Sequence, residues 1–532
     1  MIAEKTIAEK TMDMIDVSIN KDVLVIGAGL AGLDSAAKIA AQGYKVLIAC
    51  KETEFFDFGD DFNTLVKSGT IEIMTQTELE DFSGVTGDFR ATLVKGNEKI
   101  KRNFGAVIAA PNYSFEPLNA DYGLSLNGKV VSQTMMEKIL ADPEEKEKLK
   151  AGKGSVIVFL SGLARETDPC STERALRSIL AVQDLDNCEA YFCAGNVKVA
   201  SKGVERLFTK ARHNGLVCFK PIEMPMIEQN QNSLKIIIED PVIREDIELN
   251  PDYLVVDEIL NPGQGDIDTA TDLRIDTDIN GFLPSNNVHR FPVNSNREGI
   301  FVVFSPSDAS NVVLRVKELL GDGIRKVPMD RGVVDEKRCT ICLTCYRCCP
   351  HGAIFWDNGA AVISSVACQG CGICASECPM DAIQIGTFTD DDLKKDIDKA
   401  IESAKNAGAP SIVAFCCKNS AFEAALAAGT FGLEMPAGFK AIKVPCAGKV
   451  DVEFIMRALV EGADGVMVAA CHEGNCKAEK GNFYAKWRVN EISRRLEAMG
   501  INKDKVVFTN IASNMACAFA DKVNDFALKL KP

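Results

Sequence analysis

The sequence predicts an α/β protein of several domains, and three observations carry that prediction. A β-rich run, a glycine-rich turn and a helical stretch open the chain at 22–42. A short segment at 331–388 is dense in cysteine and internally repeated. Residues 411–532 again alternate apolar β-rich runs with helical stretches. A chain of 532 residues is also too long for one hydrophobic core.

The overall composition is that of a soluble globular protein, with 46% apolar and 25% charged residues. A net charge of −15 argues against a nucleic-acid partner. No apolar run approaches the ~18 residues that span a bilayer, and the N-terminus has no secretory h-region. We therefore expect a cytoplasmic protein, whose membrane association, if any, runs through a partner subunit. Twenty cysteines in such a protein favour metal or redox chemistry over disulfides.

The first region predicts a doubly wound sheet of the nucleotide-binding type. After an N-terminal tail at 1–20, the runs DVLVI (22–26) and KVLIA (45–49) flank a helix in a βαβ arrangement. Further strand-like runs lie at 155–160, 235–239, 253–260 and 299–304. Residues 21–330 are thus predicted as a two-lobed FAD/NAD(P)-binding-like region, with the second lobe at about 151–250 and inserted in the first.

A glycine motif lies between the first strand and the first helix. Gly27, Gly29 and Gly32 permit a tight turn, close approach of a pyrophosphate and close helix–strand packing. The second strand should end in an acid that binds a ribose, but Cys50 occupies that position. Glu52, two residues further along, is then the candidate for the ribose. The alternative is a retained fold with an empty or altered site.

The cysteine-dense segment repeats the pattern CxxCxxCxxxCP at 339–350 and 368–379. In two-cluster ferredoxins the first three cysteines of a run hold one [4Fe–4S] cluster and the fourth reaches across to the other. The predicted ligands are Cys339, Cys342, Cys345 and Cys378 for the first cluster, and Cys368, Cys371, Cys374 and Cys349 for the second. Cys348 is left over. A pair of zinc sites is the alternative reading. Residues 331–388 are therefore predicted as a ferredoxin domain.

A second group of cysteines follows three predicted strands of the last domain, 411–532, which a linker helix at 389–410 precedes. Loops at the carboxyl ends of the strands of an α/β sheet converge on one crevice. Four thiols should therefore meet there: Cys417, Cys446, Cys471 and Cys476. Structural zinc or simple burial of the thiols is the alternative.

These three blocks, in this order, resemble the A-type subunit of heterodisulfide reductase fused to the delta subunit of methyl-viologen-reducing hydrogenase. The B-type subunit of the quinone-interacting membrane-bound oxidoreductase complex has the same arrangement. The stretches that carry the resemblance are VIGAGLAGLDSAAKIAAQGYKV (25–46), EAYFCAGNVKVASKGVERLFTKARHNGLVCF (189–219) and CAGKVDVEFIMRALVEGADGVMVAACHEGNCKAEKGN (446–482). The resemblance implies an FAD-type doubly wound region, an inserted two-[4Fe–4S] ferredoxin-like domain, and a C-terminal α/β delta-subunit-like domain with a [2Fe–2S] cluster.

The chain departs from the family pattern at four places. Besides Cys50, the segment ETEFFDFGDDF (52–62) replaces the usual Gly-Gly-Arg stretch. The late flavin motif reads GIFVVFSPSD (299–308), where Asp308 is the candidate cofactor-binding residue. In the first delta-subunit motif, Ser420 stands where the family carries a second cysteine.

The resemblance implies an electron-transfer subunit of a heterodisulfide-reductase-like or quinone-interacting complex, often found in anaerobic metabolism. Electrons would pass between the C-terminal [2Fe–2S] cluster, the two [4Fe–4S] clusters, and FAD or a partner subunit. We identify no catalytic residues and expect chemistry on a substrate to belong to another subunit. The implied partners are other redox subunits and a hydrogenase or dehydrogenase donor. Two alternatives remain: a self-contained, flavin-based and even bifurcating oxidoreductase, and a flavin-less scaffold that docks partners.

Overall fold

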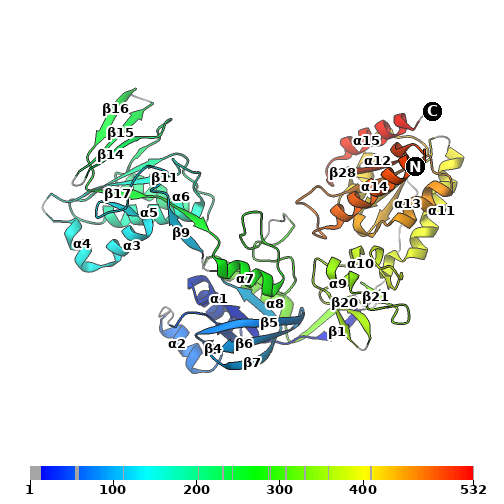
Figure 1. Ribbon diagram of the computed structural model, residues 1–532, viewed down its shortest axis with the longest axis horizontal. Helices are drawn as coiled ribbons and strands as arrows, with labels where there is room; N and C mark the ends of the chain where they lie inside the picture. The colour runs from blue at the N-terminus through cyan, green and yellow to red at the C-terminus, as the bar shows by residue number, and fades with distance from the viewer. Residues whose placement is uncertain are drawn as a thin grey trace. The chain divides into compact units, whose positions relative to one another are not determined.

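The chain forms two compact units in the computed structural model (Figure 1): Met1–Pro111 with Gly265–Pro532, and Asn112–Gln264. The residues described are 14–53, 59–111, 113–151, 153–201, 203–230, 233–241, 244–284, 287, 289–305, 308–328, 331–357, 359–407 and 410–530. The second unit interrupts the first between two adjacent strands of one sheet, and it begins earlier than the lobe predicted at about 151–250.

A five-stranded parallel sheet forms the centre of the N-terminal part of the first unit. Across the sheet the strands are β19 (Ile300–Val302), β8 (Ala106–Ala109), β2 (Val23–Ile26), β3 (Val46–Ala49) and β4 (Ile71–Met74). The three central strands are almost entirely buried, because both faces of the sheet are covered. This burial explains why they form continuous apolar runs in the sequence instead of alternating patterns.

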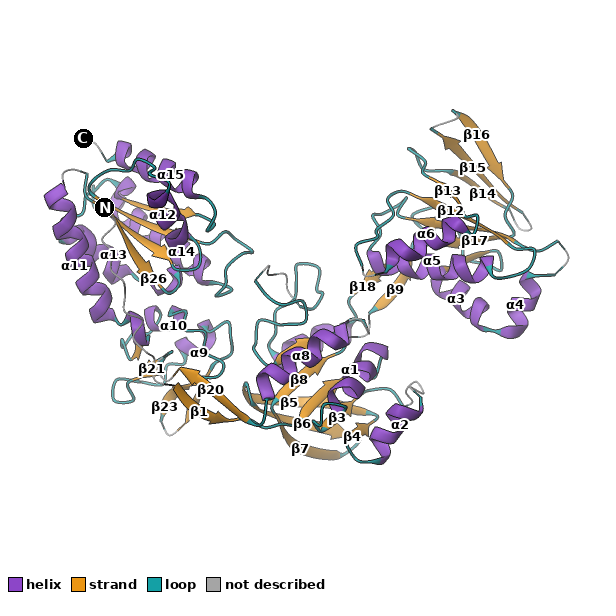
Figure 2. Ribbon diagram, turned by 180° about the vertical axis from the view of Figure 1, so that it is seen from behind, coloured by secondary structure: helices purple, strands orange, loops and turns teal. Residues whose placement is uncertain are grey.

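Different layers cover the two faces of this sheet (Figure 2). Helices α1 (Leu30–Ala40), α2 (Asp60–Lys67) and α8 (Ala309–Leu320) bury their apolar stripes on one face. The antiparallel strands β5 (Thr77–Val85), β6 (Asp88–Lys95) and β7 (Glu98–Phe104) and helix α7 (Gln264–Leu273) cover the other. Phe82 and Phe89 stack at a centroid distance of 5.3 Å in this second layer. The result is the layered α/β arrangement that a dinucleotide-type fold requires.

The segment predicted as an N-terminal tail at 1–20 contains a strand. Met14–Ser18 form β1, which pairs antiparallel with β20 (Ile324–Pro328). Residues 1–13 lie outside the described part of the chain. The two-stranded ribbon leads the chain from the N-terminal sheet toward the cysteine-rich segment, which begins three residues after β20.

The second unit has a parallel sheet of its own. Its strand order is β10 (Val130–Ser132), β17 (Tyr253–Val256), β11 (Val156–Ser161), β12 (Glu189–Ala194) and β13 (Val217–Phe219). Helices α3 (Gln133–Ala141), α5 (Pro169–Gln183) and α6 (Val204–His213) pack on one face, and α4 (Pro143–Leu149) follows α3. The antiparallel sheet of β14 (Met226–Gln229), β15 (Leu234–Asp240) and β16 (Glu245–Leu249) packs on the other. A ribbon of β9 (Ser114–Pro117) and β18 (Glu258–Asn261) completes the unit.

The cysteine-rich segment is small and contains two short helices and two antiparallel pairs of short strands. The helices are α9 (Thr344–Cys348) and α10 (Ile373–Ser376), each within one cysteine run. The ribbons pair β21 (Val333–Val334) with β24 (Ile383–Gln384), and β22 (Ile354–Asp357) with β23 (Ala360–Ile363). Cysteine side chains make up much of its small core. A domain with so few apolar side chains depends on a bound group or on a neighbouring domain for its stability.

The C-terminal domain is a three-layer α/β sandwich. Its parallel sheet has the order β26 (Phe439–Val444), β25 (Ile412–Cys417), β27 (Gly465–Ala470) and β28 (Val506–Asn510). Helices α11 (Asp390–Ala407), α13 (Val452–Val460) and α14 (Gly481–Ala498) pack on one face, and α12 (Ala421–Thr430) and α15 (Ala516–Lys529) on the other. Helix α11, predicted as a linker over 389–410, contributes Leu393, Ile397 and Ile401 to this core. Residues 408 and 409 lie outside the described residues.

Helices α11 and α14 span 18 residues each, and both carry charged side chains along their length. Within the described ranges, no helix combines the length and apolar character that crossing a bilayer demands.

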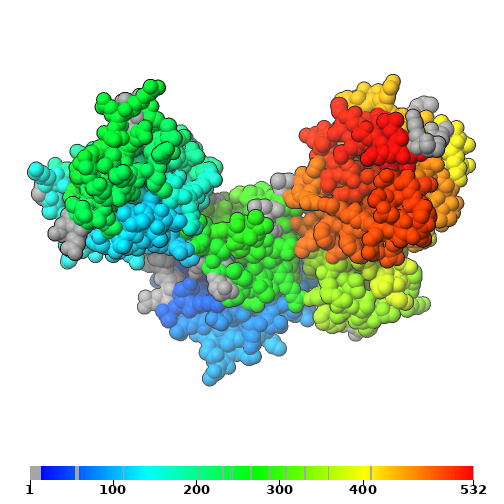
Figure 3. Space-filling model, turned by 45° about the horizontal axis from the view of Figure 1, so that its top comes forward, coloured from blue at the N-terminus to red at the C-terminus, as the bar shows by residue number. Residues whose placement is uncertain are grey.

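A buried cation joins the cysteine-rich segment to the C-terminal domain, and a second one, paired within the C-terminal domain, lies beside it. Arg488, on α14, pairs with Glu377 and donates to the carbonyls of Gly448 and Val450 at 2.9 and 2.8 Å. Lys449 pairs with Asp390 and is fully buried. A buried cation without its partners is costly, so these contacts hold the two domains in one arrangement. Figure 3 shows the contact from outside, where yellow-green and orange atoms meet.

Replacing Arg488 with Met should destabilise this assembly by about 3–5 kcal/mol, because Glu377 and two carbonyls would lose their cationic partner. The matched control is Arg494→Met on the same helix, whose pair with Glu491 is exposed. That change should stay within about 0.5 kcal/mol. Guanidinium unfolding followed by circular dichroism measures both variants, and equal losses would contradict the role given to Arg488.

Candidate functional site

The glycine turn between β2 and α1 is built as the sequence predicts for an anion site. Gly27 has φ of +107°, and a Cβ there would overlap the carbonyl oxygen of Ala110. A Cβ at Gly32 would overlap the carbonyl oxygen of Gly27 and lie 3.1 Å from the Ala110 Cβ. Helix α1 begins directly after Gly29, whose position supplies no side-chain cap. Its first N–H groups can therefore bind a negatively charged group.

Cys50 occupies the position where a ribose-binding acid is expected, and its side chain is buried. Cys50 follows β3 and is buried in the core on the α1 side of the sheet. Burial and the nearby charge of Glu52 raise the pKa of the Cys50 thiol. Glu52 itself is exposed and lies three residues beyond the end of the same strand. Within the replaced segment 52–62, residues 54–58 lie outside the described residues.

Asp308, the last residue of the late flavin motif, lies directly before α8. Its carboxylate accepts hydrogen bonds from the backbone N–H groups of Phe304 and Ser305 at 3.0 and 3.1 Å. Residues 306 and 307 of the motif lie outside the described part. The carboxylate thus closes the loop that follows β19, at the carboxyl end of the sheet.

The cysteines predicted for the first cluster line one cavity. Cys339, Cys342 and Cys345 of the first run meet Cys378 of the second run there, among apolar neighbours that include Ile341, Met380 and Ile383. Burial raises the pKa of Cys345 to about 11, and the charges of Cys378, Cys342 and Cys339 add to the rise. Backbone N–H groups of Ala361 and Ala382 donate to the sulfurs of Cys339 and Cys378 at 3.4 and 3.3 Å.

The cysteines predicted for the second cluster gather in a more deeply buried place. Burial raises the pKa values of Cys371 and Cys374, and the negative charges of Cys349 and Cys368 raise both further. Cys349, from the first run, therefore lies among three cysteines of the second run. Cys348 is buried beside them, with its thiol 3.4 Å from the carbonyl oxygen of Cys345. The crossed grouping predicted from the two Cys-Pro pairs is the one that the fold brings together.

The four cysteines predicted in the C-terminal domain form a closed ring of contacts. Cys417 and Cys471 lie 3.8 Å apart at their sulfurs, and Cys446 and Cys476 complete the ring by hydrogen bonds between neighbouring thiols. Hydrogen bonds from Cys417 and Cys476 lower the pKa of Cys471. Ser420 Oγ lies 3.3 Å from the sulfur of Cys471. Although these thiols are neighbours, neither they nor any other group of three or more His, Cys, Asp or Glu among the described residues is arranged to hold a single metal ion.

Positive charge surrounds this ring. Lys418 follows Cys417 directly, and burial together with the charges of Lys477 and Lys443 lowers its pKa. Neighbouring cations favour the thiolate form of cysteine, which is the form that binds metals. Hydrogen bonds between the thiols, together with burial, nevertheless raise the pKa values of the other three ring cysteines, Cys417, Cys446 and Cys476.

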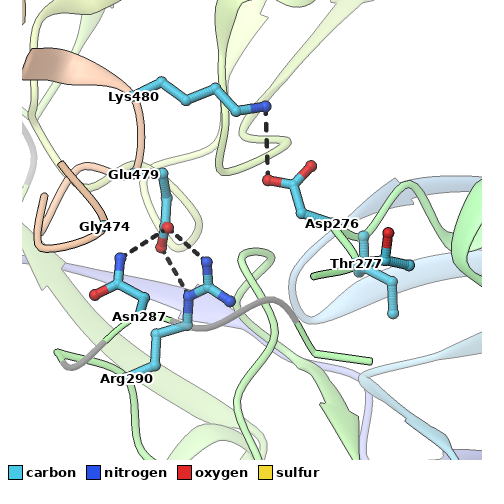
Figure 4. Close-up of a pocket in the computed structure, with 8 residues that line it drawn as sticks. Asp276, Thr277, Asn287, Arg290, Gly474, Glu479 and Lys480 are labelled. Carbon is cyan, nitrogen blue, oxygen red and sulfur yellow. Dashed lines mark hydrogen bonds and ion pairs between the residues drawn. The ribbon is translucent and has the colours of Figure 1, made fainter. Parts of the chain in front are cut away.

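The loops that carry the ring are fixed by amide side chains and one ion pair. Asn482 and Asn510 donate to the carbonyl oxygen of Cys471 at 3.1 and 2.6 Å. Asn287, from the segment after α7, donates to the carbonyl oxygen of Cys476 at 2.9 Å. Figure 4 shows Asn287 and Arg290 converging on the carboxylate of Glu479, with bonds of 2.5 to 2.9 Å.

A pocket opens beside this ion pair, and Asp276, Lys480 and Gly474 also line it. Lys480 Nζ lies 3.6 Å from Asp276 Oδ2. Each charged side chain of the pocket that Figure 4 labels has a partner of opposite sign. The pocket therefore lies between Asp276, Asn287 and Arg290 on one side and Gly474, Glu479 and Lys480 on the other. Its charged lining residues are paired with one another, so none of them is left to bind a charged ligand.

Three family models match separate parts of the chain. Residues 22–103 match an FAD binding domain, 361–384 a 4Fe-4S binding domain, and 412–532 the methyl-viologen-reducing hydrogenase delta subunit. Over 122 residues the chain is 34% identical to the D-type iron–sulfur subunit of an F420-non-reducing hydrogenase from Methanococcus voltae. That alignment covers 23% of this chain and 85% of the relative. Through its C-terminal domain, the chain belongs to the delta-subunit family.

A second relative aligns over a longer stretch of the chain. Over 260 residues the chain is 28% identical to the A-type subunit of the ferredoxin:CoB-CoM heterodisulfide reductase of Methanosarcina mazei. The alignment covers 47% of this chain and 32% of that relative, so the chain spans about a third of the relative's length. The predicted fusion of a heterodisulfide-reductase-A-like region with a delta-subunit-like domain is confirmed, and so is the α/β fold class.

Among solved structures, a T. acidophilum thioredoxin reductase aligns over 56% of this chain and 99% of its own length. The identity is 14% and the TM-score 0.34, which is too low to locate any part of the site.

Sequence reasoning missed the residues that support the cysteine groups. The sequence pattern could have indicated Arg488, because it lies on the apolar face of α14 among Ala485, Val489 and Ile492. A charged residue in such a stripe points to a buried ion pair. Asn287 and Arg290 had no such signal, because their role depends on a contact with a loop 189 residues or more away.

Replacing Gly27 with Ala should both strain the backbone and push the turn away from Ala110. Gly43→Ala is the matched control, because Gly43 also has positive φ but has nothing within 4 Å of its Cβ position. The control should lose about 1–2 kcal/mol of unfolding free energy. Gly27→Ala should lose more and retain less flavin per chain. Thermal unfolding and acid-released flavin measure the two effects, and equal unfolding losses would contradict the close approach.

Proposed function

We propose that this chain is an electron-transfer subunit that carries FAD, two [4Fe–4S] clusters and one [2Fe–2S] cluster. Electrons would pass between the C-terminal cysteine ring, the two ferredoxin-type ligand sets, and either the flavin or a partner subunit. The observation that carries the proposal is the gathering of twelve thiols into three groups of four in one compact unit.

The proposed ligand sets suit iron–sulfur chemistry in their surroundings as well as in their number. Clusters of this kind supply one-electron oxidation and reduction, at potentials set by hydrogen bonds to sulfur, by charge and by solvent exposure. Here Ala361, Ala382 and Gly370 donate backbone N–H groups to ligand sulfurs, at 3.3 to 3.4 Å. Apolar side chains line much of the cavity of the first set. These residues would therefore set different environments for the different centres.

The proposed complex follows from the relatives. One is named as the iron–sulfur subunit of a hydrogenase, and the other as part of a heterodisulfide reductase that uses ferredoxin. We propose partners of the same kinds: a hydrogenase or dehydrogenase donor, and an acceptor subunit that is heterodisulfide-reductase-like or reacts with quinone in a membrane. Catalysis on the substrate would belong to such a subunit, and the chain would work in the cytoplasm.

The flavin proposal rests on the glycine turn and on the uncapped start of α1. Gly27, Gly29 and Gly32 would hold the pyrophosphate, and Glu52 would reach the ribose from beyond the end of β3. Asp308 would act by keeping the loop after β19 in place. The buried Cys50 and the altered 52–62 segment favour the second candidate, a chain without flavin that only connects clusters and docks partners.

Anaerobically purified protein should contain about ten iron atoms per chain, from two four-iron centres and one two-iron centre. Metal analysis by plasma emission and a flavin assay after acid release provide the measurement. A content of about eight iron atoms and one zinc atom per chain would indicate that structural zinc, and not an iron–sulfur cluster, occupies the C-terminal site. A protein with ten iron atoms and no flavin would leave the scaffold candidate standing and remove the flavin proposal.

Single Cys349→Ala and Cys378→Ala variants should each damage the cluster whose other three ligands lie in the opposite run. Loss of Cys349 should affect the set of Cys368, Cys371 and Cys374, and loss of Cys378 the other set. Each variant should lose up to about four iron atoms, and the C-terminal centre should remain. Low-temperature paramagnetic resonance of the reduced protein identifies which centre is lost. Damage confined to the variant's own run would refute crossed ligation.

A further inference from the structure

The C-terminal cysteine ring and the two ferredoxin-type sets are not equally placed for exchange of electrons. We infer that the set formed by Cys349, Cys368, Cys371 and Cys374 is the direct redox partner of the C-terminal ring, and that α10 and the turn Ala447–Lys449 form a fixed junction between them. This inference rests on the proposed function and adds the order of its centres.

A short chain of contacts connects the two sites. Ile373 lies between Cys371 and Cys374, and a Cβ built on Gly448 would lie 2.7 Å from its Cγ1 atom. Gly448 is two residues from Cys446, a member of the ring. A path from Cys446 to Cys374 therefore follows the backbone to Gly448, crosses a van der Waals contact to Ile373, and follows the backbone to Cys374. Tunnelling rates fall steeply with distance, and a covalent route with a single through-space contact keeps that distance short.

Glycine permits this approach at three positions. A Cβ on Gly481 would overlap the sulfur of Cys446, and a Cβ on Gly448 would lie 2.9 Å from the Gly481 Cα. On the other side of the contact, a Cβ on Gly372 would lie 2.8 Å from the Cδ atom of Lys449. Backbone approaches this close leave no room for any side chain. Between the two domains, the backbone at Gly448 therefore meets the Ile373 side chain and the backbone at Gly372 meets the Lys449 side chain, next to the cysteines of both sites.

Polar contacts fix the junction. Ser376, the last residue of α10, donates its hydroxyl to the carbonyl oxygen of Lys449 at 2.6 Å. Glu377, the next residue, pairs with Arg488, which also holds the carbonyls on both sides of Lys449. Lys449 Nζ lies over the ring of Phe454, at 5.1 Å from its centroid. The junction thus has its buried charges paired and a fixed geometry, so it needs no docking motion before an electron moves.

The other ferredoxin-type set has no comparable contact with the ring. Cys371 packs against the core of the C-terminal domain, whereas none of Cys339, Cys342, Cys345 and Cys378 belongs to that described core. Cys342 is exposed, as is Ile341 beside it. The set around Cys342 is therefore placed for exchange at the surface. In each transfer one centre loses one electron and the adjacent one gains it, with no bond made or broken.

Paramagnetic resonance of the dithionite-reduced holoprotein tests the order of centres. Two adjacent reduced centres broaden each other's signals, so the signal of the C-terminal centre should be broadened in the unmodified chain. Cys371→Ala should abolish this broadening, and the matched change Cys342→Ala, at the same place in the other run, should preserve it. Loss of broadening in Cys342→Ala, or broadening retained in both variants, would overturn the inference.

A second variant tests the junction without removing a ligand. Gly448→Ala should push α10 away and weaken the broadening, while iron content stays at that of the unmodified protein. Gly128→Ala, where a Cβ meets nothing within 4 Å, should leave the signal unchanged. Unchanged broadening in Gly448→Ala would contradict the junction. If the unmodified protein has no C-terminal signal, the proposed function fails and the inference with it; coupling to the other set removes the inference alone.

Discussion

The contact between α10 and the turn Ala447–Lys449 is the interaction on which the arrangement of the redox sites depends. The cysteine-rich segment has a small core made largely of thiols, and it cannot gain much stability by burying apolar area. It contacts the C-terminal domain through Ile373 and through the ion pair of Glu377 with Arg488, beside which Lys449 pairs with Asp390 inside that domain. Because those ion pairs are buried, breaking one leaves an uncompensated charge, and the contact has a single preferred geometry.

This constraint explains several unusual local features together. A side chain at 372, 448 or 481 would overlap Lys449, Ile373 or the sulfur of Cys446, so close packing favours glycine at all three positions. Arg488 interrupts the apolar face of α14 because it must reach back to Glu377. Asn287 and Arg290 brace the opposite side of the ring through Cys476 and Glu479. Each of these residues acts on the backbone that carries a predicted ligand, so the positions of the thiols are determined by the tertiary structure around them.

Sequence reasoning predicted the fold class, which is confirmed, and a grouping of the cysteines, both for identifiable reasons. The paired runs ending in Cys349 and Cys378 specify a crossed arrangement by their spacing, and parallel strands bring Cys417, Cys446 and Cys471 to one edge. It did not reach the strand β1 within the predicted tail, the packing of α11 into the last domain, or the supporting ion pairs. Those features depend on contacts between distant segments, which leave no periodic pattern in a single sequence. The role of the ligands themselves remains a prediction.

The flavin region presents a contrast between a preserved turn and an altered strand end. Gly27 and Gly32 keep the close approach that the fold needs, whereas Cys50 is turned into the core where an acid would be expected. The cysteine groups carry no comparable departure, apart from Ser420 beside Cys471. The cysteine groups therefore support the proposed series of redox centres more strongly than the flavin region does, and the positions of the iron atoms are its first test.

Diffraction at the iron absorption edge from crystals of the anaerobic holoprotein tests that account most directly. The account predicts three separate iron peaks, with the one among Cys349, Cys368, Cys371 and Cys374 lying between the other two. A peak order with the Cys342 set next to the C-terminal ring, or the absence of iron at Cys417, Cys446, Cys471 and Cys476, would contradict it.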